Sequence, residues 1–351
     1  MLQLSYTDQY AFRLTGSTTA AVVALLQSVT ELLSYNQYVV VIALDFTKAC
    51  DSVRHSTLLH KMSSMNLPDE VYNWRVDFSA GRSHSTRLNG ITSELLDISA
   101  SIIQGSVVGP ASYVVNAADL TTVGLTVGNV IFKYADDTYL VIPASNVSSR
   151  ATELDHVDRW ADCNNLRLNR PKTSEIIFTD GMRMRKFTNN MPPAPIQDIR
   201  RVTSIKIFGI TITNHLSVGD HHICDVIGKC AQSLYALKLL RNHGLCDDSL
   251  RHVYKVVIFS RLLYASPAWW GFTSAADKQR LEALLRRAVG YASAYTRFTI
   301  LHFLNWLETW TTTYSQRYSS IPITLCTNFC LRKLITQFPT TESFFLINCQ
   351  D

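Results

Sequence analysis

The chain has 351 residues, of which 47% are hydrophobic and 17% charged, so it contains enough apolar material for a large buried core. This size and composition exclude a disulfide-stabilised miniprotein and a disordered tail. The net charge of +5 is unevenly divided, because residues 1–150 carry −3 and the remainder carries +8. The division favours acidic groups gathered for chemistry and a later surface suited to a polyanion, although ordinary unevenness explains it equally well.

The cysteine pattern and the hydrophobic runs bear on the compartment. Eight cysteines lie without the dense spacing of a disulfide framework, and no secretory signal is recognisable, so we expect an intracellular protein. The sequence does not distinguish the nucleus from the cytoplasm. The uncharged run at residues 98–118 is long enough to cross a bilayer but contains Gln104, Asn116 and Pro110. We interpret it as buried or functional chain and expect no membrane partner.

In chain order, the first two elements are a helix and a central strand. A hydroxyl-capped apolar run predicts a buried helix at residues 17–33, and a nearly continuous β-branched run predicts a buried strand at residues 38–46. The next elements are helices at 52–65 and 68–80, a hairpin around Asn89-Gly90 at 82–98, a second hairpin at 130–143 and a helix at 148–164. These patterns predict a mixed α+β unit.

The later part of the chain is predicted to be mainly helical. A strand is expected at residues 175–178, a loop at 182–201 and a short strand at 204–213. Apolar residues then step by three and four from Ile223 to Leu237, as on one face of a helix. Two more helices, at residues 247–264 and 274–291, complete an all-α unit, and the residues after 291 show no clear period.

Three carboxylates stand at the ends of predicted strands. Asp45 lies near the end of the buried strand, and Asp136 and Asp137 occupy the tip of the second hairpin. If the strand and the hairpin are neighbours in one sheet, the three meet at one edge, where their mutual repulsion requires cations. Two Mg²⁺ ions about 3.5–4 Å apart on such ligands can support an in-line phosphoryl transfer. Taken singly, each feature is more typical of turn chemistry or of a strand-end cap.

Six segments, read in order, carry a more specific pattern. They are QYAFR (9–13), ALDFTKACDSV (43–53), IIQGSVVGP (102–110), FKYADDTYL (132–140), NNLRLNRPKT (164–173) and IKIFGITI (205–212). This series resembles the reverse transcriptases of non-LTR, LINE-like retrotransposons over about residues 6–290. The YADD segment is the most specific single piece, and the ordered set is more specific than any one segment.

The resemblance implies an α+β fold of the right-hand polymerase type. Its palm would have a mixed or antiparallel sheet with helices on one face, joined to partial fingers and an all-α thumb. The expected units are partial fingers at residues 1–36, the palm at 37–200, primer-grip strands at 201–215, the helical thumb at 216–292 and a divergent tail of unknown role at 293–351.

The resemblance also implies an activity, its cofactor and its catalytic residues. An RNA-directed DNA polymerase transfers a nucleotide from a dNTP to a primer 3′-hydroxyl on an RNA template, with two Mg²⁺ ions. By motif match, Asp45, Asp136 and Asp137 would be the metal-binding catalytic carboxylates. Lys172 matches a family lysine that could protonate the departing pyrophosphate, although a solvated surface lysine is equally ordinary.

Substrate-binding residues follow from the same resemblance. Those expected beside the nucleotide are Arg13, Phe46, Cys50, Gln104 and Gly105, with Arg13 holding the triphosphate. Those expected at the primer are Lys206, Phe208 and Gly209. Basic residues of the following helices would lie along the template–primer duplex, and these are Lys229, Lys238, Arg241, Arg251, Lys255 and Arg261. Solvated helix faces are the alternative for about half of them.

The chain departs from the family pattern at several positions. Cys50 stands where the family has an aromatic ring that blocks a ribose 2′-hydroxyl. The residues after Arg13 lack the family's proline and glycine, and Ile103 replaces the proline before Gln104. With a start close to the arginine motif, these departures suggest a truncated copy, so the alternative is a catalytically inactive nucleic-acid-binding remnant. A group II intron maturase would have a further nucleic-acid-binding extension, which we do not find.

Overall fold

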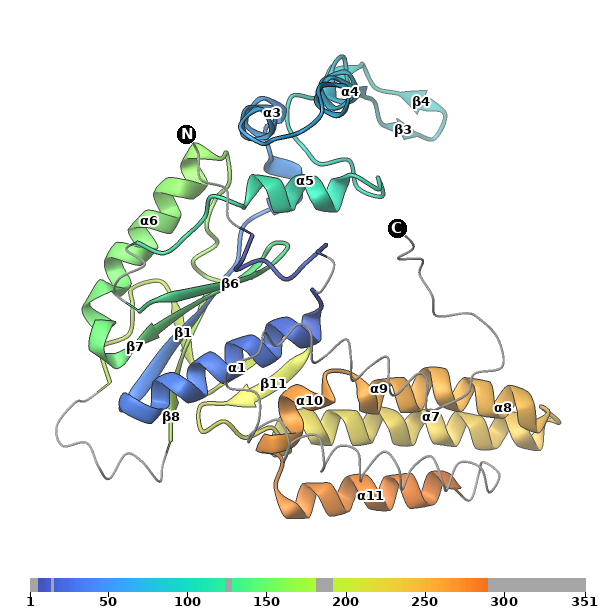
Figure 1. Cartoon of the computed structure of the whole chain (residues 1–351). Helices are drawn as coiled ribbons and strands as arrows, with labels where there is room; N and C mark the ends of the chain where they lie inside the picture. Colours follow the sequence, from blue (N-terminus) through green and yellow to red (C-terminus); the bar gives the residue numbers. More distant parts are fainter. Residues whose placement is uncertain (1–5, 14–15, 124–127, 181–191, 290–351) are drawn as a thin grey trace.

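The computed structural model of the chain describes residues 6–13, 16–123, 128–180 and 192–289. The tail expected at residues 293–351 and the last residues of the helix predicted at 274–291 lie outside them. Figure 1 shows a sheet flanked by helices, with a group of long helices beside one end of it. The mixed α+β unit followed by a helical unit is therefore confirmed over the described residues.

The central element is a five-stranded mixed sheet with the strand order β6-β7-β1-β8-β9. Its strands are β1 (Tyr38–Leu44), β6 (Val130–Tyr134), β7 (Asp137–Pro143), β8 (Ser174–Thr179) and β9 (Arg200–Val202). The first four strands pair antiparallel, and β9 pairs parallel to β8. The β-branched run thus forms the middle strand, between the hairpin β6–β7 and β8.

Helices cover both faces of this sheet, so the expectation of helices on one face was wrong. Helix α1 (Thr18–Tyr35) packs on the face that carries Val39 and Val41, whereas α6 (Arg150–Cys163) packs on the face that carries Val40 and Ile42. Successive strand residues point to opposite faces, and in β1 both sets are apolar. Each face therefore has to be buried under its own helix.

The segment between β1 and β6 forms a helical group with a projecting hairpin, seen in Figure 1 beyond α3 and α4. Its elements are α2 (Ala49–Ser52), α3 (His55–Ser63), α4 (Asp69–Ser79), β2 (Ser83–His84), β3 (Arg87–Leu88), β4 (Ile91–Thr92), β5 (Leu96–Asp97) and α5 (Gly109–Asn116). Asn89 and Gly90 both have positive φ, which confirms the predicted hairpin turn. No helix among the described residues combines the length and apolar character needed to traverse a bilayer.

A second hairpin connects the sheet to the helical unit. The predicted strand at residues 204–213 is in fact two strands, β10 (Ser204–Ile207) and β11 (Ile210–Thr213), which pair across a turn at Phe208-Gly209. The helical elements are η4 (Gly219–Ile223), α7 (Cys224–Asn242), α8 (Asp247–Val253), η5 (Tyr254–Phe259), α9 (Ser260–Leu263), α10 (Ser266–Trp269), η6 (Trp270–Phe272) and α11 (Ala275–Val289). The short η2 (Ala144–Ser149) precedes α6. One hydrophobic core runs from α1 and the sheet through this hairpin into the helices.

Candidate active site

The strand register brings two of the three carboxylates opposite each other. In the antiparallel pair β1–β7, Leu44 lies opposite Thr138 at the end of the ladder. Continued by one residue, this register sets Asp45 opposite Asp137. Residues directly opposite in an antiparallel pair have Cβ atoms about 4.5–5.5 Å apart. Asp45 and Asp137 therefore share one edge of the sheet.

The third carboxylate belongs to the turn that joins β6 to β7. Tyr134 pairs with Asp137, so the loop between them contains only Ala135 and Asp136. Ala135 has a φ of 54°, which lies in the left-handed region. A two-residue loop of this kind matches the twist of the strands and leaves Asp136 at the tip of the hairpin.

The charges of the other two carboxylates act on Asp137. Partial desolvation raises the pKa of Asp137, and the negative charges of Asp136 and Asp45 raise it further. Across the described parts of the chain, no three histidine, cysteine, aspartate or glutamate side chains gather closely enough to form a metal cluster of their own. The donor set nevertheless fits Mg²⁺, which commonly takes one or two protein carboxylates and completes its shell with water and substrate phosphates.

A loop that follows α6 is bonded to the backbone of Asp45. The backbone N–H of Asn169 donates to the carbonyl oxygen of Asp45 at 2.7 Å, and the N–H of Asp45 donates to Oγ1 of Thr173 at 3.3 Å. Thr173 is fully buried. Lys172 lies between Asn169 and Thr173, and its side chain is exposed. The short loop that carries Lys172 is therefore hydrogen-bonded to the backbone of Asp45 at both ends.

The residues just after Asp45 divide between the core and the site. The ring of Phe46 is buried against Trp160, with ring centroids 5.8 Å apart, so its side chain belongs to the core. Cys50 is half-buried on α2. Burial raises the pKa of its thiol, and the charges of Asp136 and Asp51 raise it further, so Cys50 lies near the carboxylate edge as a neutral group.

The other residues expected beside the nucleotide are exposed. Nε2 of Gln104 donates to Oδ1 of Asp51 at 3.0 Å, and the following Gly105 has a φ of 82°, which glycine adopts without strain. The Arg13 side chain folds back on its own segment, where Nη1 donates to the carbonyl oxygens of Tyr6 and Gln9, both at 3.0 Å.

Two of the three residues expected at the primer, Phe208 and Gly209, form the β10–β11 turn, which contacts the hairpin β6–β7. Phe208 is buried, and its ring lies 5.5 Å from that of Tyr134 and 4.9 Å from that of Tyr139. The hydroxyl of Tyr264 donates to the carbonyl oxygen of Phe208 at 2.7 Å. Both Phe208 and Gly209 have positive φ, and Lys206 is exposed on β10. The turn is thus packed directly against the strands that carry Asp136 and Asp137.

The family model for reverse transcriptase (RNA-dependent DNA polymerase) matches residues 2–212, more than half of the chain. The chain belongs to the reverse transcriptase family.

Curated relatives of this reverse transcriptase chain come from Drosophila mobile elements. The RNA-directed DNA polymerase from mobile element jockey of Drosophila melanogaster is 28% identical over 225 residues, which cover 61% of this chain and 24% of that protein. Its Drosophila funebris counterpart is 27% identical, covering 82% and 32%. The probable RNA-directed DNA polymerase from transposon BS of Drosophila melanogaster is 24% identical, covering 89% and 36%. These matches confirm the resemblance to LINE-like elements, and the chain spans about a quarter to a third of these relatives' length.

Solved structures similar to the chain include two telomerases. The telomerase from Candida tropicalis with the TWJ fragment of telomeric RNA has a TM-score of 0.49 and 10% identity, covering 94% of this chain and 53% of that chain. The corresponding complex from Candida albicans has a TM-score of 0.47 and 10% identity, covering 95% and 53%.

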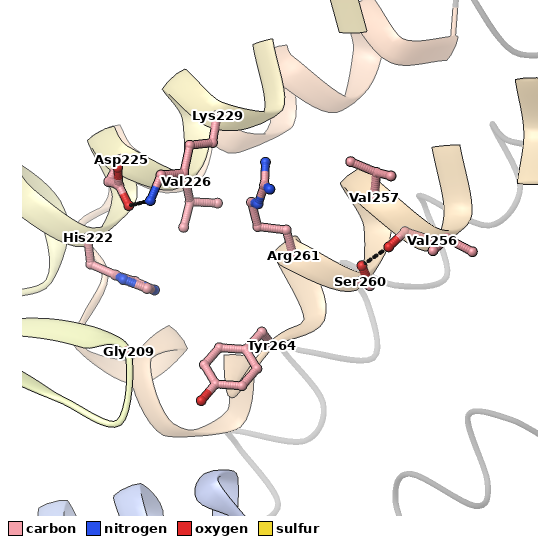
Figure 2. Close-up of a pocket in the computed structure, with 10 residues that line it drawn as sticks. All are labelled: Gly209, His222, Asp225, Val226, Lys229, Val256, Val257, Ser260, Arg261 and Tyr264. Atoms are coloured by element: carbon pink, nitrogen blue, oxygen red, sulfur yellow. Dashed lines mark hydrogen bonds and ion pairs between the residues drawn. The ribbon is translucent and has the colours of Figure 1, made fainter. Parts of the chain in front are cut away.

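A cavity of about 560 Å³ lies where the β10–β11 turn of this reverse transcriptase meets the helical unit, and Figure 2 shows its lining side chains. It is lined by Gly209, His222, Asp225, Val226, Lys229, Val256, Val257, Ser260, Arg261 and Tyr264. Lys229 is paired with Asp225 at 2.7 Å. The cavity thus lies on the helical side of the turn, away from the carboxylate edge.

Two residues near the carboxylates, Tyr113 and Gln9, were not predicted from the sequence as site residues. Tyr113 on α5 is buried, and burial raises the pKa of its hydroxyl, with smaller contributions from Asp136, Cys50 and Asp137. It lies in the uncharged run at residues 98–118 but outside the IIQGSVVGP segment, so no motif points to it. Gln9 belongs to the QYAFR segment, which identifies its neighbourhood but assigns it no role.

Proposed function

We propose that this chain is the polymerase domain of a LINE-like retrotransposon and that it extends a DNA primer on an RNA template with deoxynucleoside triphosphates. The observation that carries this proposal is the convergence of Asp45, Asp136 and Asp137 at one edge of the sheet. Family membership supplies the reaction class, and the carboxylate edge supplies a place where it can occur.

In this proposal the chain contains the palm, the primer grip, the thumb and part of the fingers of a right-hand polymerase. Residues 37–200, which include the five-stranded sheet, act as the palm, and residues 1–36 contribute to the fingers. Residues 201–215 form the primer grip, and the helices within 216–292 form the thumb. Support comes from the arrangement in Figure 1, where α7 to α11 lie beside the sheet end that β10 and β11 connect to them.

Asp45 and Asp136 would hold divalent cations, with Asp137 as the third carboxylate, and Mg²⁺ in two copies is the expected ion. When bound, such ions favour deprotonation of the primer 3′-hydroxyl and neutralise the triphosphate. The chain's own contribution is to hold three negative groups at a fixed edge. Lys172 would give a proton to the departing pyrophosphate, and the bonds that tie its loop to Asp45 support this role.

The nucleotide is held by groups around this edge. Arg13 offers a planar forked donor to the triphosphate once it leaves its present carbonyl partners. Gln104 and Gly105 contact the base pair that forms, since the open backbone at Gly105 allows a close approach. Cys50 and the backbone of Phe46 face the sugar.

The primer and the template are bound by the turn and the basic helices. The backbone of Phe208-Gly209, with Lys206 beside it, holds the primer end, because the Phe208 ring is itself committed to Tyr134 and Tyr139. Exposed basic residues of α7 and η5 contact the phosphates of the duplex, which gives binding that depends on salt and not on sequence.

Primer extension tests the proposal. The substrate is poly(rA)/oligo(dT) with dTTP and Mg²⁺, and the variant is Asp136→Asn, which removes one carboxylate charge from an exposed turn without disturbing the core. We expect extension by the wild-type chain and at least a 10³-fold lower rate for Asp136→Asn, because the effect of a lost charge in such a site is several kcal/mol. The matched control is Asp155→Asn, an exposed aspartate of α6, which should keep the wild-type rate.

Two outcomes would contradict the proposal. Full activity of Asp136→Asn would show that the carboxylate edge is not the catalytic site. Absence of extension by the wild-type chain, together with intact binding of the duplex, would identify it as an inactive nucleic-acid-binding remnant.

A further inference from the structure

The buried side chain of Gln9 is bonded to the turn that carries the candidate catalytic carboxylates. Gln9 is 2% exposed. Its Oε1 accepts a hydrogen bond from the backbone N–H of Ala135 at 3.1 Å and another from the N–H of Ala11 at 2.9 Å. Ala135 is the first of the two turn residues and immediately precedes Asp136. One side-chain oxygen therefore joins the N-terminal segment to the tip of the β6–β7 hairpin.

The segment around Gln9 is itself firmly held against β6. Gln9 and Lys133 form a parallel bridge, in which Tyr10 donates to the carbonyl of Lys133 and Lys133 donates to that of Asp8, both at 2.8 Å. The amine of Lys133 is completely buried and lies 3.0 Å from Oδ2 of Asp8. It also donates to the carbonyl oxygens of Ala117 and Leu120, which follow α5 in the chain, at 2.9 Å. The backbone of Gln9 is thus held in place by these hydrogen bonds, and its side chain extends from there to the turn.

The turn needs such a support for a physical reason. Ala135 adopts a positive φ, which is unfavourable for a residue with a Cβ atom and is therefore helped by a contact that holds the turn. The polar oxygen of Gln9 would in turn be an unsatisfied buried acceptor without the N–H groups it receives. The hydrogen bond from the Ala135 N–H serves both the turn and the buried oxygen, which accepts its second hydrogen bond from Ala11.

We propose that Gln9 is a positioning residue that fixes the Ala135-Asp136 turn and thereby sets the place of Asp136 and Asp137 for divalent cations. The proposal deepens the polymerase function proposed for this site and rests on it for the catalytic consequence. The backbone carbonyl oxygen of Gln9 also accepts a hydrogen bond from Nη1 of Arg13. The residue therefore connects the carboxylate turn with the arginine expected at the triphosphate.

A merely space-filling role for Gln9 makes a different prediction. Gln9→Met has a similar length and fills the same volume but has no oxygen for the Ala135 N–H. Gln9→Asn keeps the amide group, but its side chain is one methylene shorter and its oxygen does not reach the Ala135 N–H. This variant replaces Gln9→Met in the test if Gln9→Met does not fold. Gln37→Met is the matched control, because Gln37 precedes β1 at the end of the strand away from Asp45.

Three measurements test the proposal on the full chain: amide hydrogen exchange at Ala135, the affinity for Mn²⁺ by titration calorimetry, and primer extension over a range of Mg²⁺ concentrations. For Gln9→Met we expect at least tenfold faster exchange at Ala135, with unchanged exchange in the middle of β1. We also expect at least tenfold weaker Mn²⁺ binding and a matching rise in the Mg²⁺ concentration that gives half-maximal extension. Gln37→Met should leave all three at wild-type values.

The outcomes separate this inference from the function on which it rests. Wild-type protection of Ala135 in Gln9→Met and Gln9→Asn, with unchanged Mn²⁺ affinity, would overturn the role of Gln9 even if the wild-type chain extends primers. Loss of Ala135 protection in Gln9→Met, together with no primer extension by the wild-type chain, would confirm Gln9 as the anchor of the turn and contradict the polymerase function.

Discussion

Cys50 is the residue at which the chain's nucleotide selectivity can be tested. Its small, half-buried side chain lies near Asp136, where the family pattern has an aromatic ring. We expect Cys50→Phe to raise the preference for deoxynucleotides by about tenfold, because a ring of this size fills the space of a 2′-hydroxyl. The measurement is the ratio of kcat/KM for dTTP and UTP in primer extension.

A matched substitution controls for the change in volume. Cys163→Phe places the same ring on an exposed position of α6 and should leave the ratio unchanged. An unaltered ratio in Cys50→Phe would show that residue 50 does not face the sugar.

His222 connects the pH of the solution to the stability of the helical unit. It is 6% exposed and lies against Trp269, with ring centroids 5.4 Å apart. Burial lowers the pKa of His222 to about 4, and Lys206 and Lys229 act in the same direction while Asp225 opposes them. The unfolded chain binds this proton more tightly, so the stability is complete above about pH 6.5 and is lost as the pH falls toward 4.

Replacement of His222 by phenylalanine should remove that pH dependence. Between pH 7 and pH 5 we expect the free energy of unfolding of the wild-type chain to fall by about 2 kcal/mol more than that of His222→Phe. Urea unfolding at the two pH values measures the difference. The exposed neighbour His221, changed to glutamine, should keep the wild-type slope. Equal slopes for the wild-type chain and His222→Phe would contradict the assignment.

At the scale of single elements, the β10–β11 turn depends on one glycine. Gly209 has a φ of 89°, and a Cβ atom there would lie 3.3 Å from Cε1 of Tyr264. We expect Gly209→Ala to lower the free energy of unfolding by about 1–2 kcal/mol and to weaken primer binding, since it strains the backbone that we propose holds the primer end. Urea unfolding and duplex titration measure the two effects.

The same substitution in a helix should have the opposite sign. Gly228 lies inside α7, and a Cβ atom there would meet nothing within 4 Å. Gly228→Ala should therefore stabilise the chain by about 0.5–1 kcal/mol. If both variants changed stability in the same direction, local backbone strain would not be the cause at Gly209.

Local patterns predicted most elements because their signals lie within a few residues. The β-branched run gave β1, and Asn89-Gly90 gave the turn between β3 and β4. The local pattern predicted the β10–β11 hairpin as one strand because Phe208 is a residue typical of strands. Phe208 in fact has a positive φ, and its carbonyl oxygen accepts a hydrogen bond from Tyr264, which lies far along the chain. The burial of Phe46 against Trp160 is likewise a long-range contact that no local period signals.

The site was predictable only in part for the same reason. The identities of Asp45, Asp136 and Asp137 were accessible through their motifs, and their convergence follows from the pairing of β1 with β7. The bond from Gln9 to Ala135 joins residues 126 positions apart and depends on the path of an irregular segment. Hydrophobic patterning carries no information about such a bond.

At the scale of the whole molecule, the basic helices should determine how binding responds to salt. Lys238, Arg241 and Lys255 are exposed on α7 and η5. Each phosphate contact contributes about 0.9 to the slope of log K against log salt. We expect the double variant Lys238→Gln, Arg241→Gln to bind an RNA–DNA duplex more weakly and with a slope smaller in magnitude by about 2.

Titration of the duplex at several salt concentrations measures this slope. Arg159→Gln, on α6 at the other face of the sheet, should leave it unchanged. A slope unaltered in the double variant would place the duplex elsewhere than along α7.

The loop of the hairpin β6–β7 has only two residues, and this limits which mutations the hairpin can accept. Exchange of a side chain in β7 alters one contact, whereas insertion of a single residue there turns Tyr139 and Val141 from the α1 face toward α6. The same insertion carries Asp137 out of line with Asp45. Copies of this sequence should therefore tolerate point substitutions along the hairpin far better than a change of its length by even one codon.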